Sequence, residues 1–225
     1  MNVPPFVPPP IEIRGNVAEE AHAVRLRFIR TVVAMYAVSI LVVVGASFAA
    51  IEIGQYDLVA ILASLLLLSA VRAVEKGRPI EPQISLAVSV ILFLSLGEFV
   101  HRCLISNWPI WALLVGVACL VVYTYSCGRD LSFMGMWGLS VVVSTVLIFG
   151  LGRFLQTPLS SLGIALAANA AFITYWVYDL AALQTRRRLG EEVGAVLDLY
   201  RDVLNMFSYP IRVWNHWRTH KIWSA

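Results

Sequence analysis

Charged residues are scarce in this chain. Only 14% of its 225 residues are Asp, Glu, Lys or Arg, whereas 59% are hydrophobic and the mean hydropathy is +0.77. Soluble domains are about 45–50% apolar. The shortage of charge therefore excludes a soluble enzyme and indicates a membrane protein, for which we expect lipid, and no nucleic acid, as a partner.

Motifs for catalysis and metal binding are also missing. The three cysteines form no CxxC pair, so neither a zinc site nor a disulfide framework is predicted. No GxSG or HExxH signature occurs, and the four histidines lie outside the long apolar segments. We therefore expect neither an enzyme nor a bound cofactor.

The alternation of polar and apolar residues that is typical of membrane β-barrels is absent. The chain has long apolar runs instead, such as ILASLLLLSAV. A spanning helix needs about 20 predominantly apolar residues. The pattern predicts an all-α polytopic membrane protein with seven transmembrane helices, at residues 31–52, 58–74, 82–100, 108–126, 132–152, 161–183 and 193–213.

Short connections place these helices in one membrane domain, residues 24–213. The preceding residues 1–23 begin MNVPPFVPPP. Closely spaced prolines remove backbone donors and favour extended conformations, so we predict a disordered tail there. Residues 214–225 form a short basic and aromatic tail.

Basic residues predict a cytoplasmic N-terminus. The segments on the N-terminal side hold eleven Lys and Arg residues and the opposite loops hold two, Arg102 and Arg153; basic loops stay in the cytoplasm. The tail RVWNHWRTHKIW conflicts with this, because seven crossings put its basic residues outside. Either the last segment crosses despite the rule, which we favour, or it is re-entrant and returns to the cytoplasm.

Only a few charged residues lie within the predicted helices, and each of them needs an explanation. They are Glu98, Asp179, Asp198, Arg201 and Asp202. A charge at a helix centre costs roughly 2.5–3.5 kcal/mol, so it usually faces a partner or water. Folding the last two helices as a hairpin puts Asp179 and Asp202 at depths that differ by roughly 7 Å, and Asp198 shares a helix face with Asp202. Three carboxyl groups can therefore converge, share protons near neutral pH and offer oxygen ligands to Ca²⁺.

A purely structural role is the alternative. Asp202 can pair with Arg72 or Arg201 as a buried strut, and Asp179 can lie in water at the membrane interface. Glu98, near a helix end, can be a solvated rim residue. The RRR run before the last helix can be a solvated loop that only sets orientation.

Four stretches of the chain, in order and at characteristic spacing, are VRLRFIRTV, YTYSCGRDLSFMGMWGL, YDLAAL and GEEVGAVLDLYRDVLNMF. They lie before the first span, at the start of the fifth, at the end of the sixth and in the last. Together they resemble the lifeguard, or transmembrane Bax inhibitor motif, family, and in places its Golgi anti-apoptotic branch. The resemblance covers residues 24–209.

The resemblance implies six helices around a central seventh and a pH-sensitive Ca²⁺ leak channel of intracellular membranes that modulates calcium stores and cell death. The membrane is that of the endoplasmic reticulum or Golgi, or the plasma membrane if the protein is bacterial. It implies that Asp179 and Asp202 form the ion pathway and pH sensor, bind Ca²⁺ transiently, and exchange partners with Arg72. Glu98 and Glu191, or the glutamate that follows it, match further acidic positions.

The last segment departs from the family pattern. Asp198 and Arg201 stand where relatives usually have uncharged residues, and Arg201 can neutralise Asp202. Pro210 predicts a kink or an early end of the helix. A non-conducting regulator of apoptosis or stress signalling, acting through cell-death or calcium-handling membrane proteins, is the alternative function. The small residues of LGIALAANAAF suit such helix contacts, as they suit internal packing.

Overall fold

The computed structural model describes residues 12–49, 56–74, 81–126 and 133–220. Within these ranges every regular element is helical. The elements are η1 (Val17–Glu19), α1 (His22–Phe48), α2 (Asp57–Val74), α3 (Glu81–Ile105), α4 (Trp111–Ser126), α5 (Phe133–Phe154), α6 (Leu159–Arg186), α7 (Glu192–Arg201) and α8 (Val203–His220). The predicted all-α class is confirmed. Residues 1–11 of the predicted tail, residues 50–52 and 132 of predicted spans, and residues 221–225 lie outside the described ranges.

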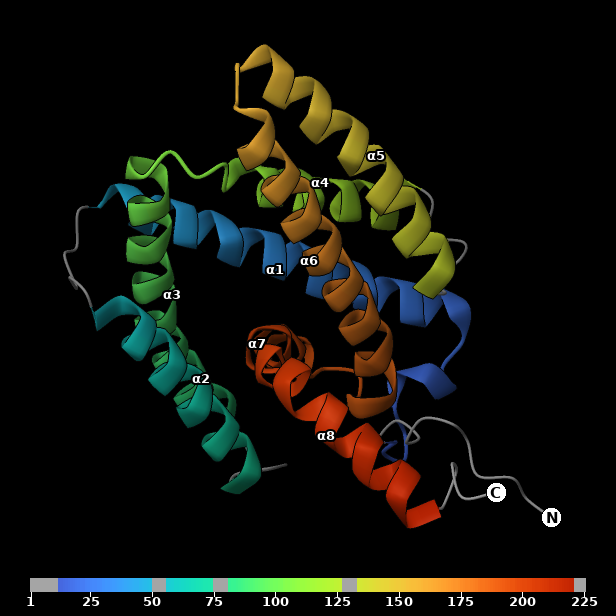
Figure 1. Cartoon of the computed structure of the whole chain (residues 1–225). Coiled ribbons are helices and arrows are strands. Elements are labelled where there is room, and N and C mark those ends of the chain that lie inside the picture. The colour runs from blue at the N-terminus through green and yellow to red at the C-terminus, as the bar shows by residue number, and fades with distance from the viewer. Residues whose placement is uncertain (1–11, 50–55, 75–80, 127–132, 221–225) are drawn as a thin grey trace.

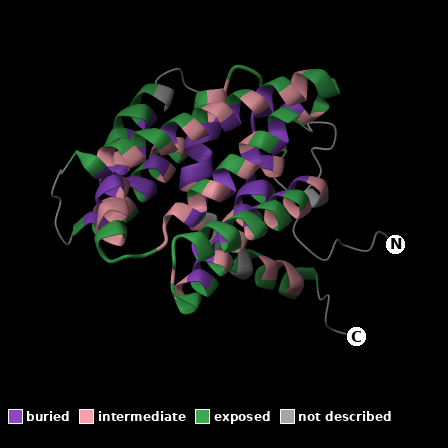
Figure 2. Ribbon diagram, turned by 90° about the horizontal axis from the view of Figure 1, so that it is seen from above, coloured by how far each residue is buried: buried purple, intermediate pink, exposed green. Residues whose placement is uncertain are grey.

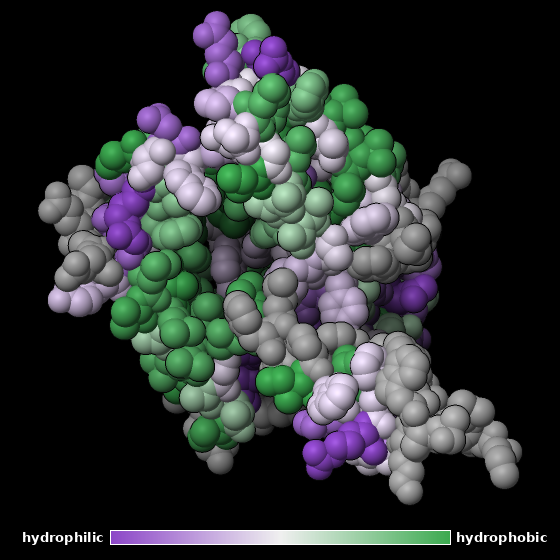
Figure 3. All heavy atoms as spheres, in the orientation of Figure 1, coloured by the Kyte–Doolittle hydropathy of each residue, from purple (hydrophilic) through white to green (hydrophobic). Residues whose placement is uncertain are grey.

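The first six predicted segments each correspond to one helix, α1 to α6. Five of these, α1, α2, α3, α5 and α6, are long and apolar enough to cross a membrane, and α4 is a shorter apolar helix of 16 residues. Many large apolar side chains on them face outward: Leu41 is 68% exposed and Val146 is 66% exposed. Figure 3 shows this broad hydrophobic surface. Since only a bilayer can cover such a surface favourably, the chain is an integral membrane protein.

The last predicted segment is not one continuous helix. It divides into α7 and α8 at Asp202, whose backbone N–H still donates to the carbonyl of Asp198 at 2.7 Å. Aspartate competes with the backbone for hydrogen bonds and so favours helix ends, and the Asp202 carboxylate is drawn to α6. The helix does not end early at Pro210, because α8 continues to His220.

Helix α7 lies within the bundle and packs against α1, α2, α3 and α6 (Figure 1). Helices α2 and α3 pair along one side, and α4 and α5 pair with each other and pack on α6. Buried residues gather where the helices face one another (Figure 2). At the centre, the ring of Tyr36 lies 5.0 Å from that of Trp176 and 5.1 Å from that of Tyr200, which ties α1, α6 and α7 together.

Residues 12–20 of the predicted tail are ordered against the bundle. Val17 in η1 is fully buried, and its N–H donates to the carbonyl of Arg187 at 2.9 Å. Ile13 donates in the same way to Thr185 at 3.1 Å, and Asn16 caps η1. The prolines explain why composition predicted disorder, but one apolar side chain and two backbone bonds fix this segment over the end of α6.

Candidate functional site

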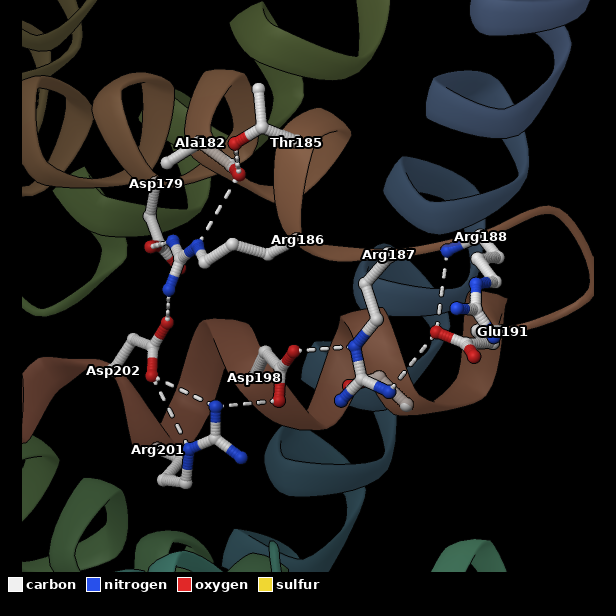
Figure 4. Close-up of polar contacts among 11 residues, drawn as sticks. Asp179, Ala182, Thr185, Arg186, Arg187, Arg188, Glu191, Asp198, Arg201 and Asp202 are labelled. Carbon is white, nitrogen blue, oxygen red and sulfur yellow. Dashed lines mark hydrogen bonds and ion pairs between the residues drawn. The ribbon is translucent and has the colours of Figure 1, made fainter. Parts of the chain in front are cut away.

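The last turn of α6 carries an arginine that joins two buried carboxylates. Arg186 donates through one terminal nitrogen to Asp179 and through the other to Asp202 (Figure 4). Asp179 lies seven residues, or about two turns, before Arg186, so both are on one face of α6. Asp202 approaches from α7, which runs back along α6. The two aspartates are 3% and 2% exposed.

A second pair extends this bridge along α7. Arg187, in the loop after α6, donates to Asp198 at 2.6 Å and to the carbonyl of Gly194 at 3.1 Å. Arg201 lies between the carboxylates of α7, 2.8 Å from Asp198 and 3.1 Å from Asp202. Opposite charges therefore alternate from the loop to the end of α7.

We call these six residues the charge network: Asp179, Arg186, Arg187, Asp198, Arg201 and Asp202. Its three carboxylates and three guanidinium groups have formal charges that cancel. Such a network is stable in a buried position because every charge has a partner at contact distance, and removing one partner strands a buried charge. One oxygen of Asp179, Oδ2, is buried without a hydrogen-bond partner among the described residues.

The other predicted residues surround the charge network or lie elsewhere. Arg72 is in the last turn of α2, and its positive charge acts on Asp198. Glu191 precedes α7, where it lies 3.6 Å from Arg187 and accepts the backbone N–H of Arg188. The contacts of Glu191 place it beside the network, and Arg72 is close enough for its charge to act on Asp198.

Glu98 belongs to a different part of the bundle. It is buried in α3, one turn before Arg102, which pairs with the fully buried Asp57 at the start of α2. The start and the end of α2 therefore each carry a charged group. Glu98 lies toward the Asp57 end, whereas Arg72 and the charge network lie toward the other.

Sequence reasoning missed the roles of Arg186 and Arg187. The RRR run predicted an orienting loop, and the structural alternative to the ion pathway paired Asp202 with Arg72 or Arg201. The second expectation includes the observed contact with Arg201. The signal that could have found Arg186 is its spacing of seven from Asp179, because residues two turns apart lie on one helix face. The pair of Asp57 and Arg102 has no comparable signal.

The carboxylates are hard oxygen ligands of the kind that Ca²⁺ prefers. In this arrangement they are occupied by guanidinium groups. Across the described residues, no group of three or more His, Cys, Asp and Glu side chains is placed to hold a metal ion. Cation binding at Asp179 and Asp202 therefore requires Arg186 to leave one of them.

The fold and the charge network define an all-helical integral membrane protein with a neutralised acidic centre between its last helices. The chain is 27% identical over 215 residues to Protein LIFEGUARD 1 of Arabidopsis thaliana, a match that covers 84% of this chain and 88% of the plant protein. This similarity supports membership of the lifeguard family and confirms the resemblance carried by the four sequence motifs. No family model matches the chain, and no solved structure matches it.

Proposed function

We propose that this protein is a pH-sensitive cation leak channel, passing Ca²⁺ across an intracellular membrane and thereby modulating calcium stores and cell death. The observation that carries the proposal is the bridge of Asp179, Arg186 and Asp202 between α6 and α7. A buried site with two carboxylates from different helices is suited to attract a cation. A removable arginine between them is suited to close the path.

In the proposed topology, α1 to α6 cross the membrane and α7 enters between them from the cytoplasmic side. The eleven basic residues on the N-terminal side support a cytoplasmic N-terminus. The packing of α7 against four helices supports its position as the lining of the path. An endoplasmic reticulum or Golgi location follows the family resemblance.

Opening separates the bridge. The side chain of Arg186 is 20% exposed, so its guanidinium can turn toward water at the end of α6. The freed carboxylates of Asp179 and Asp202 then repel each other and offer oxygen ligands. A site must attract a cation strongly enough for entry and weakly enough for release, which two carboxylates without an enclosing cage can do. Protonation of either aspartate removes this attraction, so Ca²⁺ flux rises with pH.

The direct test is Ca²⁺ flux into proteoliposomes that contain a calcium dye, at pH 6 and at pH 8. We expect the wild type to conduct more at pH 8, and Asp202→Asn to lose that dependence because one of the two titrating groups is gone. Asp57→Asn is the matched control, since it removes a buried aspartate that is paired outside the charge network. An unchanged pH profile in Asp202→Asn would eliminate Asp202 as the sensor.

One observation favours a second function. The three arginines of the charge network neutralise all three aspartates, as expected for a structural strut in a non-conducting regulator that binds calcium-handling or cell-death membrane proteins. Folded, reconstituted protein that passes no Ca²⁺ at either pH, but still protects cells from death stimuli, selects this function over the channel.

A further inference from the structure

Helix α8 differs from every other long helix of the bundle. It has 18 residues, and its sequence VLNMFSYPIRVWNHWRTH contains two arginines, two histidines and two asparagines, so it is much less apolar than the five helices that can span a membrane. In its last ten residues, apolar and polar side chains alternate with the period of a helix. The apolar Ile211, Val213, Trp214 and Trp217 share one side, on which Arg218 also lies near the C-terminal end, and the opposite side carries Arg212, Asn215, His216 and Thr219. The second half of α8 is therefore amphipathic, with one basic side chain at the end of its apolar side.

The apolar side of α8 is incompletely covered by protein. The helix packs against α7, and its first turn places Leu204 on the central core. Farther along, Ile211 and Trp214 are each 62% exposed. Indole rings concentrate at membrane interfaces, where an apolar ring and a polar N–H are both satisfied. A water-exposed position for these two side chains is therefore unfavourable, and an interfacial one is favourable.

The charge of this segment has one sign. Residues 203–225 contain Arg212, Arg218 and Lys221 but no Asp or Glu. A basic residue near an anionic leaflet contributes about 1 kcal/mol of attraction. The apolar face and the positive charge together match a membrane surface that bears anionic lipids.

The direction of α8 identifies the leaflet. In Figure 1, α8 leaves the end of α7 and runs toward the end of the bundle where α6 ends and α1 begins. That end carries the RRR run and most of the basic residues, so it is the cytoplasmic end by the same rule that orients the chain. A crossing helix would run the opposite way. The basic tail then no longer conflicts with the rest of the topology.

We propose that α8 does not cross the membrane but is an interfacial helix of the cytoplasmic leaflet, with Ile211 and Trp214 in the leaflet and Arg212 and Arg218 on anionic lipid headgroups. Helices α7 and α8 then form a re-entrant pair whose turn is at Asp202. Because α8 begins directly after Asp202, lipid bound to α8 contacts the helix next to the charge network. The proposal is independent of ion conduction, because it concerns the position and the ligand of α8 alone.

The first experiment tests the side of the membrane. Full-length protein without its native cysteines, which are replaced by Ser at positions 103, 119 and 127, receives one new cysteine, either Thr219→Cys or Leu189→Cys, in sealed liposomes. Leu189 precedes α7 and is 46% exposed. We expect an impermeant maleimide to label both cysteines from the same side. Labelling from opposite sides shows that α8 crosses and overturns the proposal.

The second experiment tests the ligand. An environment-sensitive fluorophore on Ile211→Cys, in liposomes of phosphatidylcholine with or without phosphatidylserine, reports the apolar face of α8, and the same probe on Thr219→Cys reports the polar face. We expect phosphatidylserine to shift the emission of the first probe to the blue and to protect it several-fold from iodide quenching, with little change for the second.

The variant Arg212→Gln/Arg218→Gln should lose most of that lipid-dependent protection, whereas Arg153→Gln, at the other end of the bundle, should keep it. Equal quenching of the Ile211 probe in both lipid mixtures overturns the anionic ligand. Protection that rises with protein density instead of phosphatidylserine shows that a second copy covers α8, and it also overturns the proposal.

Discussion

At the scale of single residues, Arg186 is the side chain on which the charge network depends most. Its planar guanidinium donates to two carboxylates at once, from two helices, in a geometry that the point charge of lysine cannot reproduce. The same bridge gives Asp179 and Asp202 a cationic partner in a buried position. Arg186 therefore couples the stability of the α6–α7 contact to the state of the proposed cation path.

Replacing this arginine should destabilise the protein strongly. Arg186→Gln leaves Asp179 without its cation in a buried site, and breaking a buried ion pair costs about 3–5 kcal/mol. We expect a clear fall in the thermal unfolding temperature in detergent. The exposed Arg188, whose side chain donates to the backbone carbonyl of Arg14, provides the control variant Arg188→Gln.

A second substitution separates lost charge from lost structure. Asp179→Asn in the Arg186→Gln background removes one of the stranded carboxylates, so it should restore part of the lost stability. If Arg186→Gln unfolds at the wild-type temperature, or if the added Asp179→Asn lowers the temperature further, the bridge does not stabilise the α6–α7 contact.

Gly194 is required by the second pair of the network. A Cβ atom at Gly194 would lie 2.6 and 2.9 Å from two atoms of the Arg187 guanidinium, closer than real Cβ contacts, and 3.1 Å from a third. Gly194→Ala should push Arg187 away from Asp198, and loss of a partner for a buried charged group costs at least about 1–3 kcal/mol. Thermal unfolding in detergent measures the loss.

Gly163 offers the matched control for this change. It lies within α6, and a Cβ atom there meets nothing within 4 Å. Because Ala exceeds Gly in helix propensity by up to about 1 kcal/mol, Gly163→Ala should be neutral or stabilising. Equal effects of the two substitutions would show that the packing of Arg187 against Gly194 does not matter.

At the scale of elements, η1 holds the N-terminal segment against the end of α6 through the buried Val17 and two backbone hydrogen bonds. Val17→Asp places a carboxylate in a fully buried position and should release residues 12–20. Burying an unsatisfied polar group costs about 1–3 kcal/mol, which corresponds to roughly tenfold or faster amide exchange. Hydrogen exchange at the backbone amides of residues 13 and 17, whose N–H groups donate to the carbonyls of Thr185 and Arg187, measures this against the exposed-site control Glu20→Gln. Unchanged exchange in Val17→Asp would mean that η1 protects nothing.

The elements also show what the sequence could predict. Apolar length located α1 to α6, since each is an uninterrupted hydrophobic run of nearly spanning length. The same criterion merged α7 and α8, because length and hydropathy do not show where a charged side chain turns the chain toward another helix. Asp202 bonds to Arg186, sixteen residues earlier, and such a contact depends on tertiary packing. The convergence of Asp179 and Asp202 was predictable from their depths in a hairpin, whereas the arginine between them was not predicted.

At the scale of the whole molecule, the six helices α1 to α6 combine an apolar outer surface with charged groups confined to the inside and to the ends. The buried pair of Asp57 and Arg102 lies where α2 begins and α3 ends. The charge network lies where α6 ends and α7 begins. Successive helices of a bundle run in opposite directions, so these two charged sites belong to opposite ends of the bundle. The outer hydrophobic surface between them is the part that lipid covers.

This arrangement predicts the orientation of the whole bundle. If α1 to α6 all cross and the N-terminus is cytoplasmic, the α3–α4 and α5–α6 turns lie on the far side of the membrane. In protein without native cysteines, Ser106→Cys and Ser160→Cys should then react with an impermeant maleimide only from that side, and Leu189→Cys only from the cytoplasmic side. All three positions are exposed. Ser106 is the decisive position, because it reports the crossing of α3, which packs against α7. Should it react from the cytoplasmic side, α3 does not cross, and the path proposed beside α7 would lack one of its walls.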